Sequence, residues 1–188
     1  FALLSDSLIN TAFSRLRQTM QKLLTTTQQL DTAMVNIQIA TGYNITQTKE
    51  LMYQYSNLAF EIGRTTQEVA NAANDWLRAG YEGEEANELV KASMYLSTLG
   101  MMDSTKATEA LISVLKGWKL QTDEVIGVVD KLVTVDMSAA VSAGDIATAM
   151  QNVNYSAQEA GVSMNTLIGI LTTNQEITQK EPSQVGNA

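Results

Sequence analysis

The sequence contains no cysteine and no histidine among its 188 residues, which removes most nucleophilic and zinc chemistry. Ser-His and Cys-His pairs cannot form, and the usual zinc sites need one or both of these residue types. A Mg²⁺ or Ca²⁺ site made of carboxylates remains conceivable. However, the chain has neither a D-x-[DN]-x-[DN]-G loop nor a G-x-x-x-x-G-K-[ST] loop. We therefore expect no catalytic residue, no bound metal and no cofactor, and we do not expect an enzyme.

Proline and aromatic residues are scarce. Pro182 is the single proline, and aromatic residues make up 6% of the chain. A β-rich domain of this length would need more turn residues, whereas long proline-free stretches favour helices. Hydrophobic residues still make up 45% of the chain, which is enough for a core. The composition therefore predicts an all-α fold.

Basic residues are also few: 12 Lys and Arg stand against 20 Asp and Glu, giving a net charge of −8. Phosphate backbones and anionic membrane surfaces repel such a chain, so we expect no direct nucleic-acid binding. No apolar run approaches the roughly 18 residues of a membrane helix, so membrane contact has no support. The chain begins at Phe1 without a signal-peptide pattern and ends in mid-pattern, and we expect it to be part of a longer protein.

Apolar residues recur every seven positions near the start of the chain. This spacing is typical of a coiled coil, in which helices interlock along one stripe. The flanking positions are mostly uncharged and specify no partner, so two interpretations stay open: association with another copy, or packing of a long amphipathic helix on its own domain. We call the stretch Phe13–Ile37 the heptad seam. Its a positions are Phe13, Met20, Thr27 and Met34. Its d positions are Leu16, Leu23, Leu30 and Ile37, and Ile9 before the seam continues the d spacing towards the N-terminus.

Capping residues divide the rest of the chain into short helices. The valine-rich stretch near residue 128 has a strand as its rival interpretation, but apolar spacings of three and four favour a helix. We predict helix starts at Thr46, at the Thr65–Glu68 capping box, at Glu84, at Asp103 or Ser104, at Thr122, at the Ser142–Asp145 box, at Ser163 and at Pro182.

Two stretches, 65–98 and 142–173, share the order cap, acid, helix, Ala-Gly, turn, helix. We interpret them as two similar helical hairpins, although any pair of well-capped helices would show the same order of features. The predicted organisation is a long coiled-coil helix over 1–40 and a multi-helix bundle over 41–188. Trp76 and Trp118 are expected to anchor the core. Acidic residues near residue 84 suit a helix N-terminus without any metal; they are Glu82, Glu84, Glu85 and Glu88.

A series of short motifs runs through residues 28–188. They are Leu30-Asp31-x-Ala33-Met34-x-x-Ile37, Thr41-Gly42-Tyr43, residues 72–81 (AANDWLRAGY), Glu85-Ala86, Lys91-Ala92-Ser93, Val129-Asp130-Lys131-Leu132, Asp136, Ala139-Ala140, residues 142–147 (SAGDIA), Ala160-Gly161-Val162-Ser163 and Val185-Gly186-Asn187-Ala188. Each motif is weak alone, but in their order and spacing they resemble the core region of phage tail tape measure proteins.

The resemblance implies a helical structural protein of a bacteriophage or prophage tail. Such a protein sets tail length, lies in the lumen of the tail tube, and is assembled with chaperones in the host cytoplasm. It implies three partners: parallel copies joined through Phe13–Ile37, the tail tube protein, and tail assembly chaperones. The alternative is a helical protein–protein interaction module, such as a secreted effector or adaptor. An enzyme domain would need carboxylate or Ser-Lys chemistry, for which the sequence shows no constellation.

Overall fold

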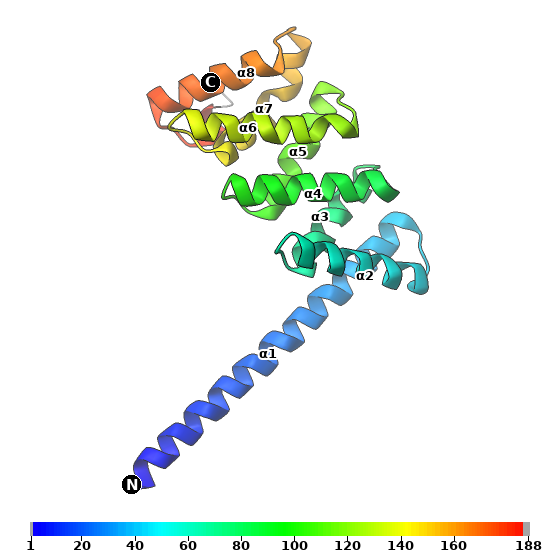
Figure 1. Ribbon diagram of the computed structural model, residues 1–188, viewed down its shortest axis with the longest axis vertical. Coiled ribbons are helices and arrows are strands. Elements are labelled where there is room, and N and C mark those ends of the chain that lie inside the picture. Colours follow the sequence, from blue (N-terminus) through cyan, green and yellow to red (C-terminus); the bar gives the residue numbers. More distant parts are fainter. Residues whose placement is uncertain (1, 186–188) are drawn as a thin grey trace.

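The computed structural model describes the backbone of residues 2–185 and the side chains of residue 11 and residues 14–185. Within this part the chain forms α-helices and one 3₁₀ helix and no strand, which confirms the predicted all-α fold (Figure 1). The elements are α1 (Ala2–Thr41), α2 (Ile45–Glu61), α3 (Thr66–Arg78), α4 (Gly83–Leu99), α5 (Ser104–Trp118), η1 (Thr122–Glu124), α6 (Val125–Ser138), α7 (Ala143–Glu159), α8 (Met164–Thr178) and α9 (Pro182–Val185).

Helix α1 projects from the other helices as a straight rod (Figure 1). Its 40 residues span about 60 Å at the usual rise per residue. The last turns of α1 and helices α2 to α9 form the body at its far end, and α8 lies at the opposite end of the molecule from the start of the rod (Figure 1). The fold therefore has two unlike regions, the rod and the body.

The body begins with the last turns of α1. Ala33 and Ile37 are buried there, and α1 contacts both α2 and α3. Helix α3 lies at the centre of the half of the body that adjoins the rod, and it contacts α1, α2, α4 and α5. Trp76 on α3 is fully buried, its Nε1 donates to Ser93 Oγ at 3.0 Å, and its ring meets Tyr81 edge-on. Trp76 is thus the predicted core anchor.

The other half of the body is built around α5 and α7. Gly117 on α5 lets the two helices approach closely, because a Cβ there would lie 2.8 Å from the Cβ of Asn154. Trp118, which is half-buried, donates from Nε1 to Asn154 Oδ1 at 3.1 Å. A Cβ on Gly144 of α7 would likewise lie 2.9 Å from the backbone oxygen of Gly100. Small residues at the crossings therefore set the spacing of this half.

Most predicted helix starts are confirmed. The Thr65–Glu68 box closes in both directions, with Glu68 N donating to Thr65 Oγ1 and Thr65 N donating to Glu68 Oε2. Ser142 and Ser163 each accept from the backbone N–H three residues on. Asp103 rather than Ser104 caps α5. Pro182 begins α9, and the valine-rich stretch is helical.

Two predicted caps are wrong. Asn44, not Thr46, caps α2: its Oδ1 accepts from Thr46 N and Gln47 N, both at 3.0 Å, and Gln47 closes the box. An Asn side chain caps at least as well as Thr, and it stands two residues earlier, where the chain leaves the turn at Gly42. Thr122 lies inside η1, because Glu124 reaches back to the backbone N–H of Gln121 at 2.7 Å and tightens this turn.

Candidate functional site: the heptad seam of helix α1

The structure divides the heptad seam into two parts. Leu16, Met20 and Leu23 are 56%, 57% and 64% exposed, and Thr27 is exposed as well. Leu30 and Met34 are half-buried and Ile37 is fully buried, where α1 meets α2 and α3. We call Leu16, Met20, Leu23 and Thr27 the free seam, and Leu30, Met34 and Ile37 the packed seam. Ile9 and Phe13 lie outside the residues whose side chains are described.

The division follows from where the body lies along α1. Every side chain from residue 14 to residue 29 is exposed, whichever way it points, because the rod projects beyond the other helices there (Figure 1). Ala33 and Ile37, one turn apart, are buried where α1 contacts α2 and α3. Helix geometry adds a smaller effect: a straight α-helix drifts by about 20° per heptad, so the d positions from Leu16 to Ile37 rotate by about 60° around α1.

The free seam holds no polar atom that needs an outside partner. Thr27 Oγ1 donates to the backbone oxygen of Leu23 at 3.0 Å, within the helix. The hydroxyls of neighbouring Thr19, Thr25 and Thr26 likewise donate to the carbonyl four residues earlier. A buried donor is costly only when it has no acceptor. Covering this face would therefore remove apolar surface from water without leaving an unpaired hydroxyl.

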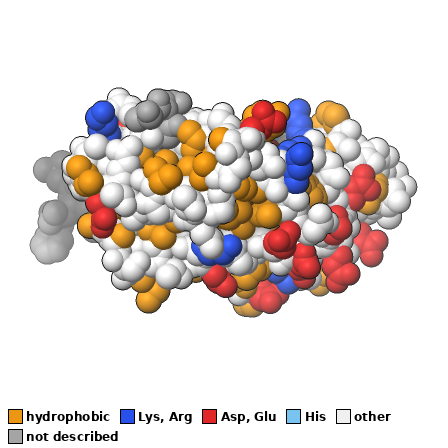
Figure 2. Space-filling view, turned by 90° about the horizontal axis from the view of Figure 1, so that it is seen from above, with side chains coloured by type: hydrophobic (Ala, Val, Ile, Leu, Met, Phe, Trp, Pro, Cys, Tyr) orange, Lys and Arg blue, Asp and Glu red, His pale blue; other side chains and the backbone are white. Residues whose placement is uncertain are grey.

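Charge is distributed unequally between the two regions. Residues 1–41 carry three basic and two acidic side chains, a net charge of +1, whereas residues 42–188 carry nine basic and eighteen acidic ones, a net charge of −9. Red acidic side chains crowd one side of the body in Figure 2. The bodies of two copies would repel each other strongly, and two rods only weakly. A contact between copies is therefore electrostatically easiest through the rod.

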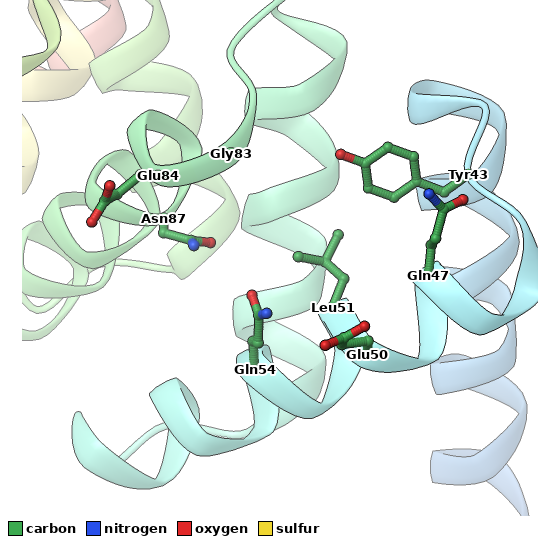
Figure 3. A pocket seen from close by; sticks show the side chains of 8 residues that line it. All are labelled: Tyr43, Gln47, Glu50, Leu51, Gln54, Gly83, Glu84 and Asn87. Atoms are coloured by element: carbon green, nitrogen blue, oxygen red, sulfur yellow. The ribbon is translucent and has the colours of Figure 1, made fainter.

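The body also carries an open pocket of about 440 Å³ between α2 and the start of α4 (Figure 3). Its lining comprises three amides, two carboxylates, one phenol, one leucine and one glycine. It contains no serine, threonine or lysine that a carboxylate could activate as a nucleophile. Among the described residues, no group of three or more Asp, Glu, His or Cys is arranged to hold a metal ion. The lining residues are Tyr43, Gln47, Glu50, Leu51, Gln54, Gly83, Glu84 and Asn87.

Comparison with known proteins places the body in a family. Residues 50–188 match the sequence profile of the phage-related minor tail proteins, about three quarters of the chain. This chain belongs to that family. No solved structure matches it. Minor tail proteins are structural components of phage tails, so a structural role in a phage tail and contacts with other tail components follow from membership. All of α1, including the whole free seam, lies outside the match.

The shifted carboxylates of this minor tail protein serve packing. Burial of Glu68 raises its pKa, but hydrogen bonds from Thr65 and the charge of Arg64 outweigh burial, so the pKa ends below its ordinary value. Burial and the nearby Glu109 raise the pKa of Asp75, against the opposing charge of Arg78. Glu68 belongs to the α3 cap, and Asp75 lies on α3, near Glu109 of α5. Neither faces the open pocket, and neither indicates a site for chemistry.

Sequence reasoning missed Arg64, which lies in the turn before α3 and links α3 to α4 in the minor tail protein. Its Nη1 lies 3.1 Å from Glu68 Oε1, and its Nη2 donates to Ser97 Oγ and Thr98 Oγ1 on α4. The i, i+4 spacing of Arg64 and Glu68 could have pointed to this ion pair. The contacts with α4 could not be found this way, because they join residues 33 and 34 positions apart.

Of the described helices, none has the length and apolar character needed to cross a membrane.

Proposed function

We propose that this chain is part of a tape measure protein, the component that sets tail length and occupies the lumen of the tail tube. The family match supports a tail protein, and the rod-like α1 is the observation that favours this particular role. A helix advances about 1.5 Å per residue, so its length is a linear function of residue number. A protein that projects a long single helix from a packed body suits a ruler with a folded module.

The proposal includes three partners. Parallel copies of the chain associate through the heptad seam, which is apolar and has no internal partner along its free part. The tail tube protein surrounds the assembled copies, and tail assembly chaperones keep the apolar rod from aggregating before the tube forms. The exposed leucines of the free seam support a need for cover, since contiguous apolar surface on a soluble protein marks a contact site.

Deletion of helical segments in the parent gene tests the length-setting role. In-frame removal of helical residues outside the body should shorten tails by about 1.5 Å per residue, measured by electron microscopy of purified particles. A deletion inside the body, within residues 65–188, should abolish assembly instead of giving a graded shortening. Tails of unchanged length after the first kind of deletion would exclude a ruler.

Mass spectrometry of purified phage particles tests the placement in the lumen. Peptides of this chain should be present in intact virions and depleted once the particles have ejected their DNA. Persistence of the peptides after ejection would exclude the lumen and indicate a fixed part of the tail. Absence from well-covered virions would instead favour a helical interaction module that acts outside the particle.

A further inference from the structure

We propose that the heptad seam has two different partners along its length: the free seam pairs with the free seam of a second, parallel copy, and the packed seam belongs to the chain's own body. The contact between copies then ends at Thr27, and the bodies diverge beyond it. This inference rests on the proposed association of parallel copies. It adds where that association ends and what ends it.

The end point comes from the packing of α1 against the body. Ala33 and Ile37 are buried under the chain's own elements, so a second copy could reach them only by displacing α3 or α2. Gln67 and Asn71 on α3 line a shallow crevice together with α1 residues from Thr25 to Asn36. That crevice lies on the face of α1 away from the seam, so it does not set the boundary. On the seam itself, exposure ends between Thr27, which is exposed, and Leu30, which is half-buried.

Several observations favour a second copy as the occupant. The free seam continues the seven-residue spacing of the packed seam towards the N-terminus of α1. Side chains of the kind that pack against the body in the packed seam are therefore available for another helix in the free seam. In a parallel, in-register pair each residue of the free seam faces its own equivalent, giving layers of leucine, methionine, leucine and threonine. The threonine layer is tolerable because the Thr27 hydroxyl already donates to the backbone oxygen of Leu23.

The flanking positions offer no obstacle to a parallel pair. Across such a pair, Thr19 faces Leu24 of the second copy and Thr26 faces Asp31, so no like charges meet at these positions. Leu24 is 62% exposed and widens the apolar face on one side. The strongly acidic bodies repel each other, so in a parallel pair they must diverge beyond the rods. The boundary itself is set by the packing of α1 on the body.

Cysteine cross-linking of the full 188-residue chain tests this boundary, since the chain has no native cysteine. Leu16→Cys, Leu23→Cys and Met34→Cys are made singly, with Gln18→Cys on the outer side of the rod as a control. Diamide oxidises two thiols to one disulfide and is itself reduced to the hydrazine. Leu16→Cys and Leu23→Cys should each give on the order of tenfold more disulfide-linked dimer than Gln18→Cys, because pairing raises the local thiol concentration. Met34→Cys should resemble the control.

Each outcome is decisive. Cross-linking at both Leu16 and Leu23 requires a parallel register, because an antiparallel pair brings identical residues together at only one level. Equal yields from Met34→Cys and Leu23→Cys would overturn the boundary, and a Leu23→Cys yield no higher than that of Gln18→Cys would overturn the pairing. Leu23→Glu should also abolish the concentration-dependent rise in mass seen by light scattering, while Gln18→Glu keeps it. A failed cross-link with tail lengths that still follow the deletions would leave the ruler proposal standing.

Discussion

The rod and the body are both helical, but different forces hold them. Every side chain from residue 14 to residue 29 is exposed. This part of the rod is therefore held only by its backbone hydrogen bonds and by threonine hydroxyls that donate to the carbonyl four residues earlier. Almost all of the buried apolar side chains belong to the body, among them Trp76, Leu89 and Leu111. An isolated helix is marginal in water because nucleation is costly, and packing provides most helix stability in proteins. Residues 14–29 of the rod therefore lack the tertiary packing that stabilises the helices of the body.

Truncating a large core side chain gives the largest expected difference between the two regions. Trp76→Ala should lower the free energy of unfolding of the body by about 3–5 kcal/mol, because it opens a cavity at a fully buried site and leaves Ser93 without its donor. Leu23→Ala in the rod should change it by less than about 0.5 kcal/mol in the monomer, since Leu23 is exposed there. Urea denaturation followed by circular dichroism at low protein concentration measures both. Similar losses for the two variants would show that the rod is packed even in a single copy.

The helix crossings inside the body should be the next most sensitive sites. Gly144→Ala places a Cβ 2.9 Å from the backbone oxygen of Gly100 and 3.2 Å from the Cβ of Met102, which forces the crossing apart. We expect a loss of about 1–3 kcal/mol, the usual range for overpacking. Gly169→Ala on α8 is the matched control, because nothing lies within 4 Å of its Cβ and alanine is the better helix former. A stable Gly144→Ala variant would mean that α4 and α7 can slide apart freely.

The junction between rod and body depends on the cap of α2. Asn44→Ala should cost about 1 kcal/mol, because two backbone N–H groups lose their acceptor. Thr46→Ala should be neutral within about 0.5 kcal/mol, since Thr46 is exposed and lies inside the helix. Thermal unfolding of the two variants side by side is the measurement. A larger loss at Thr46 than at Asn44 would contradict the observed cap.

The smallest effects come from the shifted carboxylates and have opposite signs. The folded state lowers the pKa of Glu68, so its contribution to stability is present above the ordinary glutamate pKa and disappears as the pH falls through the folded value. Glu68→Gln should therefore lower the melting temperature at about pH 7 and matter less at about pH 3. The folded state raises the pKa of Asp75, so its contribution is present at low pH and is lost as the pH rises through the folded value.

Asp75→Asn should accordingly raise the melting temperature slightly at about pH 7 and leave it unchanged at about pH 3. The two variants serve as controls for each other, because the same pH change should move them in opposite directions. Parallel changes in both melting temperatures would mean that a global charge effect of the acidic body outweighs the local environments.

Local signals predicted most of the fold. The Thr65–Glu68 box, the Ser142 and Ser163 caps and the Pro182 start are interactions within four residues, so the sequence displays them directly. The Asn44 cap was equally local and was missed because Thr46 offered a plausible rival. The likeness of the two predicted helical hairpins, the role of the heptad seam in pairing and the division at residue 40 stay predictions. The links from Arg64 to α4 and from Trp118 to Asn154 could not be predicted, because they join distant parts of the chain.

The sequence by itself determined that this protein is helical, where most of its helices begin, and that an apolar stripe runs along the first of them. Those properties depend on backbone hydrogen bonds and on side chains a turn or two apart. Only the tertiary structure decided that the stripe is divided, with Ile37 buried in the body and Leu23 left open. Which side of a helix is covered depends on where α2 and α3 come to lie, and a seven-residue repeat carries no information about helices that arrive from elsewhere in the chain.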